Sequence, residues 1–163
     1  MDFLDSAEGA KAVLQALGRE GITVEQRRRI ASLLAYRNCC KAGKALLAAR
    51  DASMDPETKM WLQIALGWSE APECRAAVIA GLLDKDVWLR RASFLAADRL
   101  KHADVVEALL GFLKSPELEL RWNASYTLRG LTGGRLDVNV YGPQAKIDGA
   151  ARWWVENKAG YGK

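Results

Sequence analysis

The sequence predicts an all-α protein, a right-handed α-solenoid of stacked helical hairpins, and two observations carry that prediction. First, an acidic residue followed four positions later by a basic one recurs at a spacing of 31 residues. Second, apolar residues recur three and four positions apart, the spacing of one helix face, and only four prolines interrupt the 163 residues. A repeat of about 20 to 50 residues is the signature of an array of stacked units. The repeat set comprises Arg28, Asp55, Lys59, Asp86, Arg90, Glu117, Arg121, Asp148 and Arg152.

Capping residues set the predicted helix boundaries. Ser6 can cap a first helix, and Thr23 with Gln26 has the spacing of a capping box. Asp55 before Pro56 is an N-cap followed by proline at the first helical position. The predicted helices cover about 6–18, 24–36, 39–50, 55–68, 71–83, 86–100, 103–114, 117–131 and 148–158.

These helices alternate along the chain as hairpins of two. We name the helix at the acid position of each repeat the A helix and its partner the B helix; the first helix is an unpaired B helix that caps the array within residues 1–22. Each hairpin has too little apolar surface to fold alone, so neighbouring hairpins must stack. We therefore expect one repeat domain over residues 1–163.

The alternation fails once, at residues 132–147, where two glycines and Gly142-Pro143 replace a B helix. The apolar residues Leu136, Val138 and Val140 alternate with polar ones, which predicts an ordered loop with a short extended piece that folds over the last hairpin. Residues 148–163 then form the C-terminal capping helix.

The formal net charge of +4 is concentrated at one end of the chain. Residues 19–50 contain eight Arg or Lys and two Glu, a net charge of +6, whereas residues 51–163 are neutral. No apolar run reaches the length of about 20 residues that a membrane span needs, and the acidic N-terminus lacks a secretory leader. We therefore expect a cytoplasmic protein without a membrane partner.

Cysteine and histidine usage argues against metal and disulfide chemistry. Cys39 and Cys40 are adjacent and Cys74 makes an odd third, which fits no disulfide framework. His102 is the single histidine, and its spacing from the cysteines matches no usual zinc motif. We expect packed thiols, no metal and no cofactor.

Two segments resemble HEAT repeats of the short bacterial type. They are D-x-D-x-x-x-R-R-A-S-x-x-A-A at 84–97 and SPELELRWNA at 115–124, followed by LTG at 131–133 and ARWW at 151–154. The resemblance implies a solenoid of helical hairpins. HEAT-like proteins usually bind proteins, some bind nucleic acid and some attach bilins; one hydroxylates a protein at a di-iron centre, whose paired His-Glu motifs a single histidine cannot supply.

The repeated acid–base pairs are interpreted as structural. An acid at the start of each A helix favours the helix dipole and can pair with the base four positions later. The base can also reach the acid of the next hairpin and so tie neighbouring repeats together. Every repeat contacts its neighbours, so a residue found at the same position in every repeat is expected to take part in those contacts.

Aromatic residues at otherwise polar repeat positions are the candidate binding residues. Trp88 stands where the preceding repeat has Glu57, and Phe94 stands where it has Gln63, so both are expected to face solvent. The alternative for Trp88 is that it covers a gap between stacked hairpins. The same gap-covering role is expected of Trp122, Trp153 and Trp154.

No nucleophile–base arrangement, phosphate-binding glycine motif or G-x-S-x-G elbow is present. We therefore expect no enzyme; the activities of HEAT-like DNA glycosylases and bilin-attaching proteins stay open, because their roles cannot be placed on residues here. The expected function is a protein-interaction module or adaptor that presents its B-helix face to an unidentified protein. The alternative is nucleic-acid binding by the basic segment 19–50, where Lys41 and Lys44 share a helix face and Lys44 aligns with Arg75.

Overall fold

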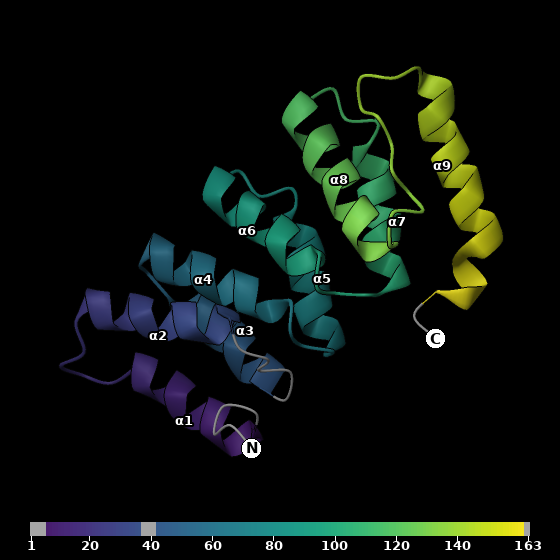
Figure 1. Ribbon diagram of the computed structural model, residues 1–163. Helices are drawn as coiled ribbons and strands as arrows, with labels where there is room; N and C mark the ends of the chain where they lie inside the picture. The colour runs from purple at the N-terminus through teal and green to yellow at the C-terminus, as the bar shows by residue number, and fades with distance from the viewer. Residues whose placement is uncertain (1–5, 37–41, 162–163) are drawn as a thin grey trace. The chain divides into compact units, whose positions relative to one another are not determined.

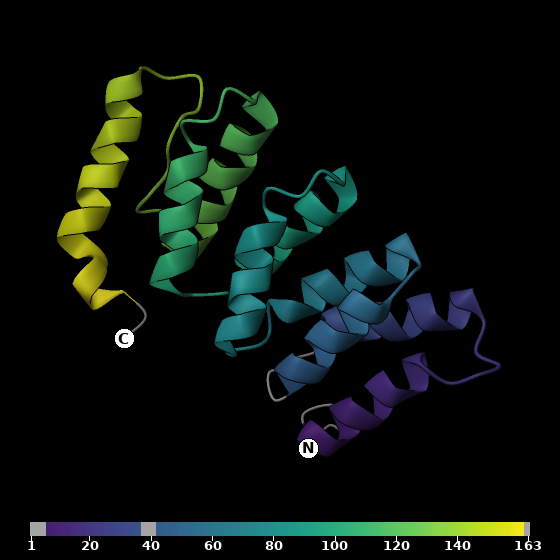
Figure 2. The ribbon, with the colours of Figure 1, turned by 180° about the vertical axis from the view of Figure 1, so that it is seen from behind.

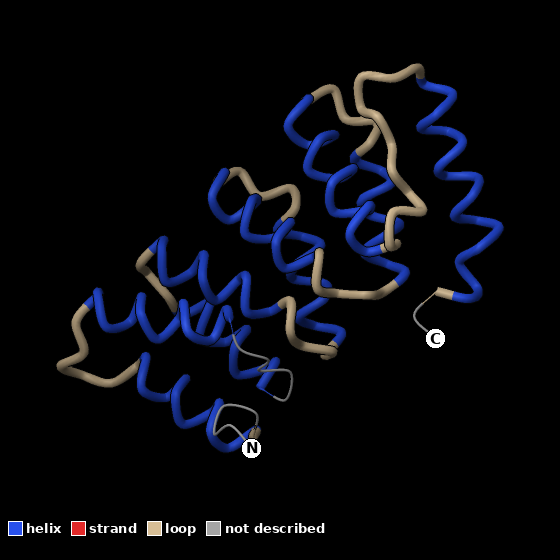
Figure 3. Tube along the Cα trace, in the orientation of Figure 1, coloured by secondary structure: helices blue, strands red, loops and turns tan. Residues whose placement is uncertain are grey.

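A computed structural model describes residues 6–36 and 42–161 of the chain. Within these ranges the protein forms nine α-helices and a short 3-10 helix, without any strand, which confirms the all-α prediction (Figures 1 and 3). The elements are α1 (Ala7–Leu17), α2 (Val24–Tyr36), α3 (Gly43–Ala52), α4 (Pro56–Leu66), α5 (Pro72–Gly81), α6 (Val87–Ala97), α7 (Ala103–Phe112), α8 (Leu118–Leu131), α9 (Gln144–Asn157) and η3 (Lys158–Gly160).

The predicted caps form as hydrogen bonds. The hydroxyl of Ser6 accepts from the Gly9 amide at 2.9 Å. Thr23 and Gln26 exchange a reciprocal pair at 2.9 and 3.2 Å, a complete capping box at the start of α2. Each bond satisfies an amide at a helix start that has no partner within the helix. Local sequence therefore determines where α1 and α2 begin.

The chain divides into two compact units, Met1–Leu100 and Lys101–Lys163. In the first unit the A helices α2, α4 and α6 contact one another in order, and the B helices α1, α3 and α5 do the same. The A helices form one layer and the B helices form the other (Figures 1 and 2). Within each layer, every helix contacts the helix two places further along the chain. This pairing is consistent with stacked hairpins.

A buried polar network crosses the core of the first unit. The guanidinium of Arg50 donates to the side-chain oxygen of Gln63 at 2.7 Å, and the amide nitrogen of Gln63 donates to the Ser93 hydroxyl at 2.8 Å. Gln63 and Ser93 are fully buried, so these bonds satisfy groups that water cannot reach. Gly81 makes room for the pair, because a Cβ there would collide with the Ser93 hydroxyl. The network therefore links α3, α4 and α6.

Arg99 closes the ends of two A helices in the same unit. Its guanidinium donates to the carbonyl oxygens of Ala35 at 2.8 Å and Ile64 at 3.2 Å, and it lies 4.5 Å from the centroid of the Trp68 ring. The Trp68 indole also donates to the Ala35 carbonyl, at 2.9 Å. Carbonyls at helix C-termini lack partners within the helix and favour a cation. Arg99 thus joins the ends of α2 and α4, although burial lowers its pKa.

In the second unit α7 packs against α8. Gly133 and Gly134 then adopt φ values of +61° and +82°, a left-handed conformation that glycine tolerates best. This reversal sends residues 136–141 back along α8, with Leu136, Val138 and Val140 buried. The loop predicted from that alternation therefore covers its own hairpin.

The predicted start of the last helix is wrong by four residues, because α9 begins at Gln144 rather than at residue 148. Pro143 occupies its N-cap position, and its fixed φ favours a helix start directly after it. Asp148 consequently lies inside α9, where it accepts from the Gln144 side chain and pairs with Lys114, each at 3.3 Å. It does not open the helix as its repeat position implied.

The C-terminal elements of the second unit are anchored by aromatic side chains. Trp154 is buried, as its predicted capping role requires, and its ring meets that of Tyr161 edge-on at 5.0 Å. The carboxylate of Glu107 on α7 accepts from the Trp154 indole at 3.5 Å and pairs with Lys158 at 3.1 Å. These contacts hold α9 and η3 against α7.

Candidate functional site

A groove of about 380 Å³ opens on the A-helix layer of the first unit. Its lining comes from three successive A helices and consists of Arg28 on α2, Pro56, Glu57 and Met60 on α4, and Trp88 on α6. We call it the Trp88 groove. Glu57 and Trp88 are one 31-residue repeat apart, so the stacking of α4 on α6 brings equivalent positions together.

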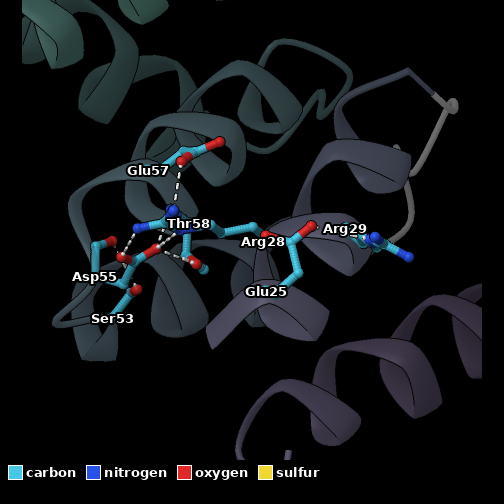
Figure 4. Close-up of polar contacts among 7 residues, drawn as sticks. All are labelled: Glu25, Arg28, Arg29, Ser53, Asp55, Glu57 and Thr58. Atoms are coloured by element: carbon cyan, nitrogen blue, oxygen red, sulfur yellow. Dashed lines mark hydrogen bonds and ion pairs between the residues drawn. The ribbon is translucent and has the colours of Figure 1, made fainter. Parts of the chain in front are cut away.

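The Arg28 guanidinium lies on one wall of this groove between two carboxylates (Figure 4). It binds Asp55 through two hydrogen bonds of 2.8 and 3.1 Å and pairs with Glu57 at 2.9 Å. The Asp55 carboxylate also accepts from the Thr58 amide at 2.8 Å and caps α4. Bidentate arginine–carboxylate pairs fix both partners in direction, so the wall is rigid before any ligand arrives.

Trp88 forms the opposite side of the groove and is 61% exposed, which confirms the prediction that it faces solvent. The guanidinium of Arg91 lies 5.6 Å from its ring centroid, a cation–π contact that restrains the indole. Asp86 accepts from the Trp88 amide at 2.8 Å and caps α6. The groove therefore combines an exposed aromatic wall with an apolar floor of Pro56 and Met60.

The prediction that Phe94 faces solvent is wrong, because its side chain is only 5% exposed. Polar residues at the equivalent repeat positions suggested an exposed site, but two of them, Gln63 and Ser125, are buried as well, whereas Glu156 is exposed. Gln63 is held by Arg50 and Ser93, and Ser125 donates to the Val138 carbonyl at 2.5 Å. At Gln63 and Ser125 the polar side chain thus forms a core hydrogen bond, and Phe94 is a core residue of α6.

The repeated acid–base pairs show two kinds of contact. Arg28 reaches forward to Asp55 of the next hairpin, as predicted for the basic position. Arg90 and Arg121 each donate to the carbonyl six residues earlier, that of Asp84 at 3.3 Å and that of Ser115 at 2.8 Å. These arginines hold the loop that precedes their own A helix, a role that the acid–base spacing did not indicate.

Replacing Asp55 by asparagine should remove part of the acid sensitivity of the protein. Hydrogen bonds from Arg28 and then Thr58 hold the pKa of Asp55 well below its ordinary value. A lowered folded-state pKa stabilises the fold at pH values above the unfolded pKa of about 3.9, and the contribution is lost as the pH falls below it. Urea denaturation at pH 7, 4 and 3 should show a smaller decline for Asp55→Asn than for the wild type.

Asp86→Asn is the matched control for that experiment. Asp86 caps α6 as Asp55 caps α4, and within the described ranges its carboxylate has no arginine partner. Asparagine is an equally good cap in both places. Equal pH profiles for the two variants would show that Arg28 contributes nothing to the acid response.

Exposed aromatic residues also gather in the second unit. The rings of Trp122 and Tyr126 on α8 stack at 5.6 Å with an angle of 10°. Together with Tyr141 they border a groove of about 260 Å³ that runs between α8 and residues 137–141. Trp122 is 53% exposed, and its expected gap-covering role stays a prediction. Trp153 is partly exposed and lines a different groove, beside α9.

Two of the three residues chosen for nucleic-acid binding have an interaction within the protein. Lys44 on α3 pairs with Glu73 at 3.6 Å, and Arg75 on α5 also has an interaction within the protein. Lys41 lies outside the described residues, as do Cys39 and Cys40. Arg29 pairs with Glu25 at 3.0 Å. Nucleic-acid binding by this segment stays a prediction, with fewer unpaired cations than the sequence suggested.

The Trp88 groove offers recognition chemistry: an aromatic wall, an apolar floor and one fixed arginine. Within residues 6–36 and 42–161, no three His, Cys, Asp or Glu side chains are grouped so that they could hold a metal ion. In the same ranges no helix is both long and apolar enough to cross a membrane. No model of a known protein family matches the chain, and no curated protein matches it.

Proposed function

We propose that the chain is a non-catalytic protein-interaction module, a HEAT-like right-handed α-solenoid that captures a segment of a partner protein in the Trp88 groove. The observation that carries this proposal is the position of Trp88, exposed on the wall of an apolar groove that three A helices build. Tryptophan is among the residues enriched at the hot spots of protein interfaces.

The rigidity of the groove supports the proposal. Arg28 is fixed by Asp55 and Glu57, and Trp88 is restrained by Arg91, so little side-chain freedom is lost on binding. A preorganised site spends less of its interaction energy on ordering. An aromatic or large aliphatic side chain of the partner would fill the groove between Met60 and Trp88.

The proposed surface lies on the A helices, not on the B helices as the sequence interpretation placed it. The exposed large apolar residues within the helices of the first unit all belong to A helices, as far as the structure describes that unit. They are Val24, Leu33, Tyr36, Trp88 and Leu95.

Selection from a random-peptide display library on the immobilised full chain, with counter-selection on Trp88→Ala, tests the proposal. Enriched peptides should share a large apolar residue and should lose at least about 2 kcal/mol of binding free energy with Trp88→Ala, as tryptophan anchors do. The melting temperature should stay near that of the wild type, because the side chain is exposed.

Leu33→Ala is the matched control, since Leu33 is 57% exposed on the same layer and does not line the groove. Equal binding by wild type and Trp88→Ala would refute the proposed groove. A pull-down from the source cell, analysed for protein and nucleic acid together, addresses the alternative function. Retained nucleic acid that is released steeply with rising salt would favour the basic segment.

A further inference from the structure

A second groove, of about 440 Å³, lies in the second unit between residues 135–139 and helix α9. Arg135 and Asp137 line it from the loop, and Lys146, Gly149 and Trp153 line it from α9. We call it the α9 groove. It shares no residue with the Trp88 groove.

On the loop side of the α9 groove, residues 137–139 lie between two turns and show the burial pattern of an extended chain. Leu136, Val138 and Val140 are buried, whereas Asp137 and Asn139 between them are exposed. Such alternation is that of a β-strand, in which neighbouring residues also direct their backbone N–H and C=O groups to opposite edges. The Val138 carbonyl accepts from the Ser125 hydroxyl on α8. The Val138 carbonyl therefore faces α8, and in an extended chain the N–H of the same residue faces the same edge.

It follows that the backbone groups of Asp137 and Asn139 face the other edge, toward α9. The Asn139 carbonyl accepts from the Gly142 amide at 2.9 Å. Within the described ranges, the Asp137 N–H, the Asp137 C=O and the Asn139 N–H have no hydrogen-bond partner in the protein. Unpaired groups along an extended edge are a template for an added strand.

The charges around the groove are predominantly basic. Arg135 and Lys146 lie at its rim, and among the described residues neither is within ion-pair distance of a carboxylate. The Asp137 carboxylate pairs with Arg129 on the α8 side, at 3.8 Å. An extended segment in this groove would therefore meet two uncompensated cations, which favours acidic side chains.

We propose that the α9 groove binds an extended acidic peptide segment, which adds as a strand to the edge at Asp137 and Asn139 while its carboxylates meet Arg135 and Lys146. Main-chain hydrogen bonds would supply the attachment and the two cations the preference for acidic sequence. Neither this site nor its ligand depends on the Trp88 groove.

The probe is an acetylated, amidated and fluorescein-labelled heptapeptide of alternating glutamate and valine, titrated against the full chain by fluorescence anisotropy. Two analogues carry N-methyl groups either on every valine or on every glutamate, so each blocks one edge of the peptide and leaves its charge unchanged. One analogue should bind at least about tenfold more weakly than the parent, because its N-methyl groups remove the donor to the Asp137 carbonyl and sterically keep that edge of the peptide away from the two free N–H groups. The analogue with lysine in place of glutamate should not bind.

Gly149→Leu adds a side chain to a residue that lines the groove, at a position where a Cβ meets nothing within 4 Å. It should weaken binding at least about tenfold by filling the space that the peptide occupies. Gly111→Leu is the matched control: Gly111 is equally open, lies on α7 and does not line the groove. Its affinity should equal that of the wild type.

Amide hydrogen exchange followed by NMR gives a direct readout of the added strand. Bound peptide should slow exchange at Asp137 and Asn139 and leave Val138, whose backbone groups face α8, unchanged. Equal affinity of both N-methylated peptides and the parent would overturn strand addition, as would unchanged binding to Gly149→Leu. Absence of binding up to about 1 mM peptide, the limit of weak specific association, would overturn the site itself. None of these outcomes bears on the Trp88 groove.

Discussion

Replacing Phe94 by alanine should lower the free energy of unfolding by about 3–5 kcal/mol, the cost of truncating a buried phenylalanine. Phe94 is 5% exposed on α6, a helix that packs against both α4 and α5. Removal of its ring would leave a cavity that the two neighbouring helices fill only in part. Urea denaturation followed by far-ultraviolet circular dichroism measures the change.

Leu95→Ala provides the matched control for Phe94→Ala. Leu95 is the next residue of the same helix, but it is 56% exposed. Its truncation should cost less than about 1 kcal/mol, as surface substitutions usually do. Losses of similar size in the two variants would mean that Phe94 does not lie in the core. If only Phe94→Ala strongly lowers the free energy of unfolding, any loss of partner binding by this variant is explained by unfolding.

Gly67→Ala should destabilise the protein by about 2–3 kcal/mol, the range for a methyl group forced into a packed interior. A Cβ at Gly67 would lie 2.5 Å from the carbonyl oxygen and 2.8 Å from the Cα of Ala96. Both are backbone atoms of α6, so no side-chain rotation can relieve the overlap. The helices α4 and α6 would have to move apart, and thermal denaturation should show a lower melting temperature.

Gly18→Ala separates steric from conformational effects. Gly18 and Gly67 are both C-cap residues in the right-handed helical conformation, with φ values of −90° and −63°. At Gly18 the nearest atom to an added Cβ is the Gln15 carbonyl oxygen, at an ordinary 3.8 Å. Gly18→Ala should therefore be neutral or slightly stabilising. An equally harmful Gly18→Ala would show that close helix approach is not the cause at Gly67.

The helices of the first unit were predictable because their signals are local. Ser6, the Thr23 and Gln26 pair, and Asp55 before Pro56 each cap the helix that follows. These residues act on amides within three positions of themselves, so no knowledge of the tertiary structure is needed. The start of α9 failed for the complementary reason: the 31-residue repeat was extended across Pro143, whose local effect is stronger.

Repeat alignment predicted the exposure of Trp88 correctly and that of Phe94 wrongly. A polar residue at the equivalent position can be either exposed to solvent or buried with hydrogen-bond partners. Glu57 is an exposed acid, and its equivalent Trp88 is exposed too. Gln63 is polar but buried, since Arg50 and Ser93 satisfy its amide. Whether a polar residue is solvated or paired depends on partners more than ten residues away, and the helical periodicity does not contain that information.

Only part of the lining of the Trp88 groove could be predicted from the sequence. The 31-residue separation of Glu57 and Trp88 implies that they are neighbours on stacked A helices, a signal that could have paired them. No repeat spacing identifies Pro56 and Met60 as groove residues, because small differences in helix packing decide which side chains reach the groove. The α9 groove depends on the course of an irregular segment after Gly134, for which the repeat offers no template.

The buried network of Arg50, Gln63 and Ser93 limits which hairpins of the array are interchangeable. If residues 55–85 were deleted, one full period would be lost and Phe94 would take the place of Gln63 beside Arg50. The guanidinium would then keep its ion pair with Asp51 but lose its amide acceptor and face an apolar ring, which leaves part of a largely buried group without a hydrogen bond. The hairpin that contains Gln63 is therefore not interchangeable with the one that contains Phe94, and removing 31 residues here would require the residue beside Arg50 to change as well.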